Sequence, residues 1–231
     1  PIPLKHSPGC TWRFPPMPLD PNPLPTVMAL TQDGLVLSHE DQARALTAAG
    51  VRWIQLRMKH AAPDRWVSTA RAVVAICRDA GALCIINDSV DVALAAGADG
   101  VHLGRLDGNW SDARRRLGPD RVIGGTVNYA DDTRRAAASQ ALNYVGIGPF
   151  RFTTTKQNLA PVLGLAGIAA LLPLLGPLPA WAIGGVRPDD LPAVRRAGLA
   201  GVAVSSSLYL DNQIAANYAA TVAGNPPCAW R

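Results

Sequence analysis

Residues 83–103, LCIINDSVDVALAAGADGVHL, contain one complete repeat of the fold. The apolar runs Leu83–Ile86 and Gly100–Leu103 predict two buried strands, and Val90–Ala96 between them predicts a helix. Gly97 follows that helix, at the position where glycine commonly ends an α-helix. Continuous apolar strands joined through a helix are typical of parallel βαβ units, so this stretch indicates an α/β protein.

The same alternation continues outward from this unit in both directions. Six more strands are predicted at Val27–Leu30, Arg52–Leu56, Val122–Thr126, Tyr144–Ile147, Ala180–Ile183 and Gly201–Val204. Seven more helices are predicted at Glu40–Ala49, Asp64–Ala80, Trp110–Leu117, Asp131–Gln140, Leu165–Leu172, Pro188–Arg196 and Leu208–Val222. Eight such repeats predict a closed (β/α)8 TIM barrel. The alternative, an open doubly wound sheet, would carry a glycine-rich fingerprint after its first strand, where this chain has Thr31-Gln32-Asp33-Gly34.

The two ends of the chain differ from this pattern. Nine of residues 1–26 are proline, which lacks an amide donor and blocks helices, so an irregular Pro-rich N-terminal arm is predicted there. Residues 27–222 form the predicted TIM-barrel catalytic domain, and residues 223–231 a C-terminal tail.

The composition of the 231 residues narrows the class of protein. A hydrophobic content of 48% with 17% charged residues excludes disorder for most of the chain. The net charge is +5, but the largest basic cluster, Arg114–Arg116, fits the solvated face of a helix, so no nucleic-acid partner is expected. Residues 157–186 carry no charge, but prolines and glycines interrupt them, so no membrane partner is expected. The four cysteines have no paired spacing and residues 1–13 no continuous apolar run, so reduced thiols and a cytoplasmic location are expected.

Polar side chains follow nearly every predicted strand, at the end of a TIM barrel that carries the active site. Gln55, Arg57 and Lys59 alternate along the chain, so all three lie on one side of an extended segment. If that side faces the barrel axis, one amide and two cations suit a phosphate or diphosphate; otherwise the three residues point to solvent.

Two carboxylates follow the third and fourth predicted strands. Asp88 and Asp107 near a cationic pocket are typical of a Mg²⁺ ion that also binds phosphate oxygens. The alternative for Asp88 is an N-cap of the helix that starts at Val90. His102 is expected to be a structural residue at the end of its strand rather than a ligand.

Thr153-Thr154-Thr155-Lys156 offers hydroxyl groups and one ammonium after the sixth strand, and Lys156 is expected to join Arg57, Lys59 and the metal in a first anion site. A second anion site is predicted from the loops after the last two strands. Gly184-Gly185 and Ser205-Ser206-Ser207 offer backbone N–H groups after the seventh and eighth, where such barrels commonly bind phosphate. Two anion sites at one barrel mouth indicate a transfer reaction between two anionic substrates.

Six segments, taken together and in order, resemble thiamine phosphate synthases. They are IQLRMK (Ile54–Lys59), IINDSVDVAL (Ile85–Leu94), GADGVHLGRLD (Gly97–Asp107), YVGIGPFRFTTTK (Tyr144–Lys156), AIGGV (Ala182–Val186) and GVAVSSS (Gly201–Ser207). The resemblance implies a transferase of thiamine biosynthesis. It would join hydroxymethylpyrimidine diphosphate to hydroxyethylthiazole phosphate, with Mg²⁺ assisting the departure of diphosphate.

The resemblance also implies a role for each site residue. The pyrimidine diphosphate would be held by Gln55, Arg57, Lys59, Asn87 and Lys156, and Mg²⁺ by Asp88 and Asp107. The thiazole phosphate would be held by Thr153, Thr155, Gly185 and Ser206, with Ser205 beside them. Thr126 stands where the family commonly has serine and would keep a hydroxyl group near the diphosphate. The residues expected to be catalytic are Arg57, Lys59, Thr126 and Lys156.

The chain departs from the family pattern at several positions. Asn128 stands where relatives usually have His, Met58 where Glu is common, and the loop 150–152 lacks the common aromatic-Pro pattern. One alternative is a thiazole tautomerase, whose proton transfer depends on His at the position of Asn128; another is a non-catalytic paralogue that binds phosphate ligands. The Thr-x-Thr-Lys loop and the paired carboxylates favour a synthase. The resemblance leaves open a monomer or a homodimer.

Overall fold

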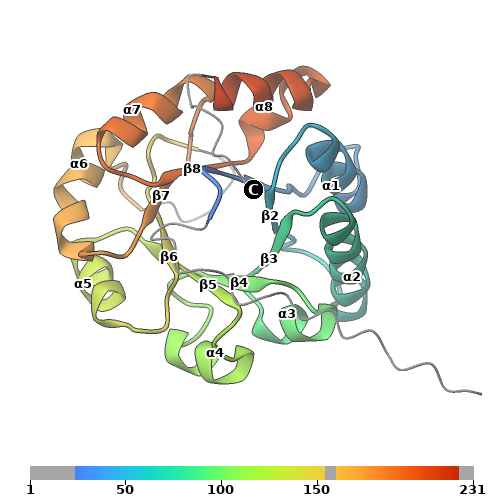
Figure 1. The fold of residues 1–231 in the computed structure, drawn as a ribbon, viewed down its shortest axis with the longest axis horizontal. Coiled ribbons are helices and arrows are strands. Elements are labelled where there is room, and N and C mark those ends of the chain that lie inside the picture. Colours follow the sequence, from blue (N-terminus) through green and yellow to red (C-terminus); the bar gives the residue numbers. More distant parts are fainter. Residues whose placement is uncertain (1–23, 154–159, 224–231) are drawn as a thin grey trace, which may run out of the picture.

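The computed structural model describes residues 24–153 and 160–223. Eight parallel strands follow one another around a closed barrel, and β1 pairs with β8 to complete it (Figure 1). The predicted (β/α)8 TIM barrel is therefore confirmed. The strands are β1 (Val27–Leu30), β2 (Trp53–Leu56), β3 (Leu83–Asn87), β4 (Gly100–Leu103), β5 (Val122–Val127), β6 (Tyr144–Ile147), β7 (Ala180–Ile183) and β8 (Gly201–Val204).

The helices form an outer ring around the strands (Figure 1). They are α1 (His39–Ala48), α2 (Pro63–Asp79), α3 (Val90–Ala96), α4 (Trp110–Leu117), α5 (Ala130–Ala138), α6 (Gly164–Leu171), α7 (Leu191–Arg196) and α8 (Ile214–Val222). Side-chain caps start three of them, at Ser38 for α1, Ser89 for α3 and Asn109 for α4. Gly97 ends α3 in the left-handed conformation, as its position predicts.

The last helix differs from its prediction over Leu208–Val222. It begins only at Ile214, after the short 3-10 turns η3 (Ser206–Leu208) and η4 (Leu210–Asn212). Asp211 and Asn212 have positive φ angles of 52° and 54°, which interrupt a right-handed helix. The apolar spacing of this segment reflects packing of Leu208 and Ile214 onto the barrel rather than one continuous helix.

Aromatic side chains fill the inside of the barrel. Trp53, Tyr144 and Trp181 are fully buried and pack edge to face, with ring centroids 4.9–5.7 Å apart. Gly124 makes room for them, because a Cβ atom there would overlap the ring of Tyr144. The interior is therefore a packed core, and a ligand can enter only beyond the carboxyl ends of the strands.

Alternation along the strands separates this interior from the outer core. On β2, Trp53 belongs to the interior cluster, whereas Ile54 and Leu56 pack in the cluster beneath the helices. Gln55 has the same parity as Trp53, and its Nε2 lies 3.5 Å from Sδ of Met28, inside the barrel. Continuation of this parity directs residues 57 and 59 toward the axis.

The described part of the predicted arm belongs to the barrel. Leu24 is buried in the interior cluster, the carbonyl of Pro25 accepts a hydrogen bond from Nε1 of Trp181, and that of Thr26 accepts from Val202. Residues 24–26 therefore close the amino-terminal end of the barrel. The rest of the arm, residues 1–23, and residues 224–231 of the tail lie outside the described residues.

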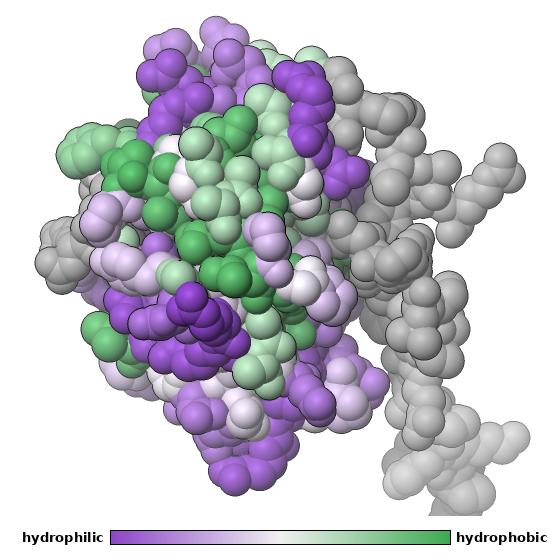
Figure 2. Space-filling model, turned by 90° about the vertical axis from the view of Figure 1, so that its left-hand side faces the viewer, coloured by the Kyte–Doolittle hydropathy of each residue, from purple (hydrophilic) through white to green (hydrophobic). Residues whose placement is uncertain are grey.

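One side of the molecule carries an apolar surface. Figure 2 shows hydrophobic residues gathered on the side where α6 lies, and residues 160–179 contain no charged side chain. The exposed apolar residues of this segment include Val162, Ala166, Ala169, Ala170 and Leu174. No helix in the described ranges combines the length and hydropathy needed to span a membrane.

Candidate active site

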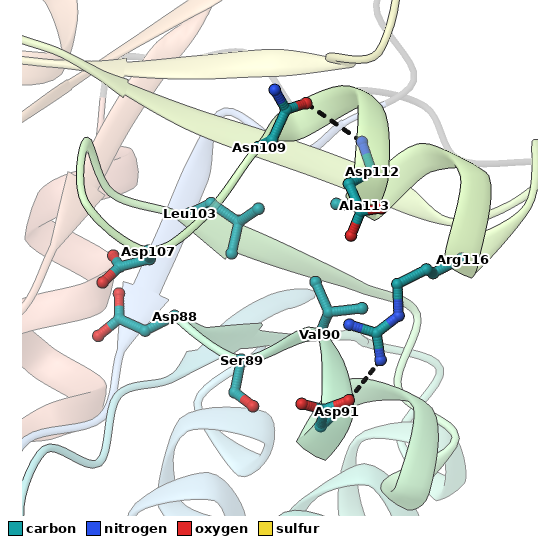
Figure 3. A pocket seen from close by; sticks show the side chains of 11 residues that line it. Asp88, Ser89, Val90, Asp91, Leu103, Asp107, Asn109, Asp112, Ala113 and Arg116 are labelled. Atoms are coloured by element: carbon teal, nitrogen blue, oxygen red, sulfur yellow. Dashed lines mark hydrogen bonds and ion pairs between the residues drawn. The ribbon is translucent and has the colours of Figure 1, made fainter.

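Two carboxylates meet at the mouth of the barrel. Asp88 follows β3 and Asp107 lies in the loop after β4, and Figure 3 shows their carboxylates side by side at one end of a pocket of about 180 Å³. Ser89, not Asp88, caps α3, so the capping alternative for Asp88 is wrong. Asp88 instead has a φ of 67° and donates its N–H to the carbonyl of His102 (2.8 Å), which turns its side chain toward Asp107.

Burial beside a second acidic side chain shifts the pKa of Asp88. Burial and a hydrogen bond to Asp107 raise the pKa of Asp88 to about 6, although the neighbouring ammonium of Lys59 opposes the shift. Lys59 forms an ion pair with Asp88. In residues 24–153 and 160–223, no group of three or more His, Cys, Asp or Glu side chains is arranged to hold a metal ion, so these two carboxylates are the described candidates.

Glycine 104 allows Asp107 to reach its position. Oδ2 of Asp107 accepts a hydrogen bond from the N–H of Gly104 (2.8 Å). A Cβ atom on Gly104 would overlap that carboxylate. This glycine stands in the quoted sequence motif, but only the folded loop shows that a side chain there would displace the Asp107 carboxylate.

The predicted cationic segment, residues 55–59, lies beside the carboxylates of Asp88 and Asp107. Gln55 is 1% exposed inside the barrel, Arg57 is half-buried, and the Lys59 ammonium reaches Asp88. The interpretation in which these residues simply point to solvent is therefore wrong for Gln55, whereas Lys59 is exposed and pairs with Asp88. Met58, between the two cations, is buried.

Asn87 offers a donor that the described residues leave unused. Its side chain is 6% exposed, and its Nδ2 is buried with no hydrogen-bond partner within the described ranges. A buried donor without an acceptor is costly, so this atom is suited to an acceptor on a ligand.

A buried chain of hydrogen bonds supports Thr126 from below. Nε2 of His102 lies 3.0 Å from Oγ1 of Thr126, and Nδ1 of His102 lies 3.0 Å from the hydroxyl of Tyr144. Burial raises the pKa of Tyr144 well above its usual value, so this hydroxyl stays neutral. His102 is 5% exposed, and its two ring nitrogens contact Thr126 and Tyr144.

The loops of the predicted second anion site lie together. Ser207 donates its hydroxyl to the carbonyl of Val186 (2.9 Å), which joins the loops after β7 and β8. Arg151 donates to the carbonyl of Gly185 (3.2 Å) and forms a two-pronged ion pair with Asp190. The unusual loop 150–152 is thus tied to the loop after β7.

The other residues predicted to bind an anion near these loops differ in their exposure, and some lie outside the described residues. Ser205 donates to Oε1 of Gln32 (3.4 Å), and Ser206 is exposed at the start of η3. Thr153 is described, whereas Thr155, and Lys156 predicted for the first site, lie outside the described residues.

Asn128 forms a hydrogen bond that joins two strand ends. Its Nδ2 donates to the carbonyl of Gly148 (2.6 Å), and it is 7% exposed. Its backbone N–H donates to Asp132, the residue that caps α5. The amide therefore fastens the end of β6 to the end of β5.

Two residues of the loop after β1 contact the cationic segment, and the sequence pattern predicts no role for them. Thr31 and Asp33 accept hydrogen bonds from the N–H groups of Arg57 (3.0 Å) and Lys59 (2.9 Å). His39, the first residue of α1, contacts both acceptors in turn. The one signal for Thr31 and Asp33 is their place, as polar residues directly after β1 at the carboxyl end of the barrel.

Comparison with known proteins identifies the family of the chain. The family model for thiamine monophosphate synthase matches residues 27–208. A thiamine-phosphate synthase of Bacteroides fragilis is 41% identical over 175 residues, covering 74% of this chain and 85% of that protein. One of Myxococcus xanthus is 44% identical over 178 residues, covering 77% and 81%. The solved thiamine phosphate pyrophosphorylase from Pyrococcus furiosus has a TM-score of 0.76 at 27% identity, covering 85% of this chain and 93% of that one. The chain belongs to the thiamine monophosphate synthase family.

Proposed function

We propose that this chain joins hydroxymethylpyrimidine diphosphate to hydroxyethylthiazole phosphate and releases diphosphate, as a thiamine phosphate synthase. Its relatives carry that name. The observation that carries the proposal is the Asp88–Asp107 pair beside the Lys59 ammonium at the barrel mouth. Together with Nδ2 of Asn87, which has no partner among the residues that the structure describes, these groups suit a diphosphate ester.

The reaction breaks one C–O bond and makes one C–N bond. The electron pair of the C–O bond leaves with the diphosphate, and the ring nitrogen of the thiazole supplies the pair for the new bond to the pyrimidine CH₂ group. Arg57 and Lys59 would hold the negative charge that grows on the departing oxygen. No general base is needed, because the thiazole nitrogen carries a lone pair. Holding both substrates at one mouth supplies the orientation.

We propose Mg²⁺ as the cofactor, held by Asp88 and Asp107. The donor set fits this ion, since magnesium takes one or two carboxylates and completes its shell with phosphate oxygens and water. The raised pKa of Asp88 indicates two crowded acids, which a divalent cation would relieve. When bound there, the ion neutralises charge on the leaving diphosphate.

The tautomerase alternative finds no support at residue 128. Asn128 carries an amide, which does not transfer protons at neutral pH, and this amide is engaged with the Gly148 carbonyl. A non-catalytic paralogue is not favoured either, because the carboxylate pair and the Lys59 ion pair are both present.

We also propose that the chain forms a homodimer in the cytoplasm. The charge-free segment 160–179 supports the dimer, because copies of a chain with net charge +5 repel one another least where no charge is present. Exposed apolar residues of α6 would be buried between the two copies. Cys77 and Cys84 are buried free thiols, as in a reducing compartment.

Turnover of the two purified substrates tests the proposed reaction. We expect thiamine phosphate and diphosphate in equal amounts when Mg²⁺ is present, and none after EDTA treatment. Asp107→Ala should lose most of this turnover. Absence of product from the parent protein, with the thiazole phosphate still bound in calorimetry, would overturn the synthase proposal.

A further inference from the structure

The pairing between β1 and β2 continues past the end of both strands through side chains. Within the backbone, the N–H of Thr31 donates to the carbonyl of Gln55 (3.0 Å). Beyond that point the hydroxyl of Thr31 accepts from the N–H of Arg57 (3.0 Å), and Oδ2 of Asp33 accepts from the N–H of Lys59 (2.9 Å). Two side-chain oxygens therefore take the place of strand carbonyls and hold the cationic segment extended.

The imidazole of His39 spans these two acceptors. Its Nδ1 lies 2.9 Å from Oγ1 of Thr31, and its Nε2 lies 3.0 Å from Oδ1 of Asp33. A carboxylate only accepts, so Nε2 carries the proton of the second bond. Oγ1 of Thr31 accepts from Arg57 and can turn its own proton to Nδ1, so every group in the chain has a partner of the right kind.

The bonds of His39 are not needed to build the loop or the helix that carries it. Ser38 caps α1 by accepting from the N–H of Asp41. Gln42 ties down the loop by bonding both the N–H and the carbonyl of Gln32, as well as the carbonyl of Leu37. The His39 side chain is 11% exposed, and its two ring nitrogens contact the two residues that grip the cationic segment.

We propose that His39 is a positioning residue, which acts through Thr31 and Asp33 to hold Arg57 and Lys59 in the extended form that receives a diphosphate. This inference rests on the proposed function, in which these two cations hold the leaving group. Arg57 and Lys59 have long side chains with many conformers, so a fixed backbone limits where their charges lie. Loss of the contacts of His39 with Thr31 and Asp33 should weaken diphosphate binding and leave binding at the thiazole phosphate site unchanged.

The test uses two pairs of readouts on the whole chain. His39→Phe keeps the ring but removes both hydrogen bonds, Thr31→Val removes the hydroxyl, and Thr31→Ser restores it. We expect His39→Phe and Thr31→Val to raise KM for the pyrimidine diphosphate about tenfold. The calorimetric Kd of inorganic diphosphate with Mg²⁺ should rise equally. KM for the thiazole phosphate should not change, and Thr31→Ser should match the parent.

Several outcomes would overturn the proposal. One is a fall in Tm while KM for the pyrimidine diphosphate and KM for the thiazole phosphate stay unchanged, because this result would assign His39 a structural role only. Another is an equal rise in both KM values. If the parent forms no thiamine phosphate, the proposed function fails, but the diphosphate titration still decides the role of His39. A Kd for inorganic diphosphate that is tenfold higher in His39→Phe than in the parent then supports the positioning role of His39, and an unchanged Kd overturns it. Thr31→Val supplies the same decision if His39→Phe does not fold.

Discussion

The ammonium of Lys59, which follows β2, forms an ion pair with the carboxylate of Asp88, which follows the neighbouring strand β3. Asp88 also forms a hydrogen bond to Asp107, so Lys59 pairs with one of the two residues proposed to hold the metal. In the proposed reaction, the Lys59 ammonium would turn from Asp88 to the diphosphate oxygens, and Asp88 and Asp107 would be the residues that hold Mg²⁺. The ion pair thus keeps the buried acid and the cation compensated while no substrate is bound.

The first prediction concerns this carboxylate pair. Asp88→Asn removes one negative charge and should lower kcat by about 10²–10³-fold, because the leaving group loses its neutralising partner. Asp91→Asn is the matched control, since Asp91 lines the same pocket but pairs with Arg116 on the helix surface. Quantified thiamine phosphate formation checks both. Equal losses in the two variants would contradict the assignment.

The second prediction concerns the glycine beneath Asp107. Gly104→Ala should push the Asp107 carboxylate out of place, and the Mg²⁺ concentration for half-maximal activity should rise about tenfold. Gly167→Ala, on the far helix α6, is a suitable control for the same change. Titration of activity with Mg²⁺ is the measurement. A Gly104→Ala enzyme with the parent's Mg²⁺ curve would show that Asp107 does not act on the metal.

The third prediction separates the hydroxyl of Thr126 from its methyl group. Thr126→Val removes the partner of His102 and the hydroxyl near the proposed diphosphate, so kcat/KM should fall about tenfold, the equivalent of one hydrogen bond. Thr126→Ser keeps the hydroxyl and should stay close to the parent. Steady-state kinetics with both substrates compare the pair. If Thr126→Ser loses as much as Thr126→Val, packing rather than the hydroxyl matters.

The fourth prediction is the acid sensitivity of the loop after β7. Burial by itself would raise the pKa of Asp190, but the ion pair with Arg151 and the N–H of Arg187 outweigh burial, so the pKa lies below its ordinary value of 3.8. The folded state therefore binds this proton less readily than the unfolded state. Stabilisation by Asp190 is complete above the unfolded pKa and is lost as pH falls through the folded pKa.

Thermal unfolding at two pH values checks this sign. Asp190→Asn should lower Tm clearly at pH 7 and less at pH 3, where the parent has lost part of the same interaction. Asp131→Asn, which breaks an exposed pair with Arg134, should change Tm little at either pH. An Asp190→Asn effect that is equal at both pH values would contradict the prediction.

The fifth prediction tests the apolar face of α6. Ala169 is exposed on this face, so Ala169→Arg would place like charges opposite one another in a symmetric dimer. Light scattering after size exclusion should show a dimer for the parent and a monomer for the variant. Ala216→Arg, an exposed change on α8, should remain dimeric. A parent that elutes as a monomer would remove the dimer proposal.

The barrel and most of its strand ends could be predicted because they depend on local pattern. Continuous apolar runs, helix-ending glycines and polar residues at strand ends are all visible along the chain, and β2 and β3 match their predicted places to within one residue. The Asp88–Asp107 pairing also followed, since neighbouring parallel strands bring their carboxyl ends together.

The supporting contacts could not be predicted in the same way. Arg151 meets Asp190 across 39 positions, and His39 meets Asp33 only because the loop after β1 folds back. Such contacts depend on loop conformations, in which backbone and side chains choose partners together. Asp88 shows the same difficulty, since its sequence neighbourhood equally suits a helix cap and only its left-handed backbone decides.

The aromatic packing of Trp53, Tyr144 and Trp181 has a kinetic consequence. With the barrel filled beneath the site, two substrates enter and two products leave through a single opening. If the two products lie one behind the other in that opening, the outer one would leave first. Product inhibition patterns would then be those of an ordered sequence, with one product competing with the substrate that binds first.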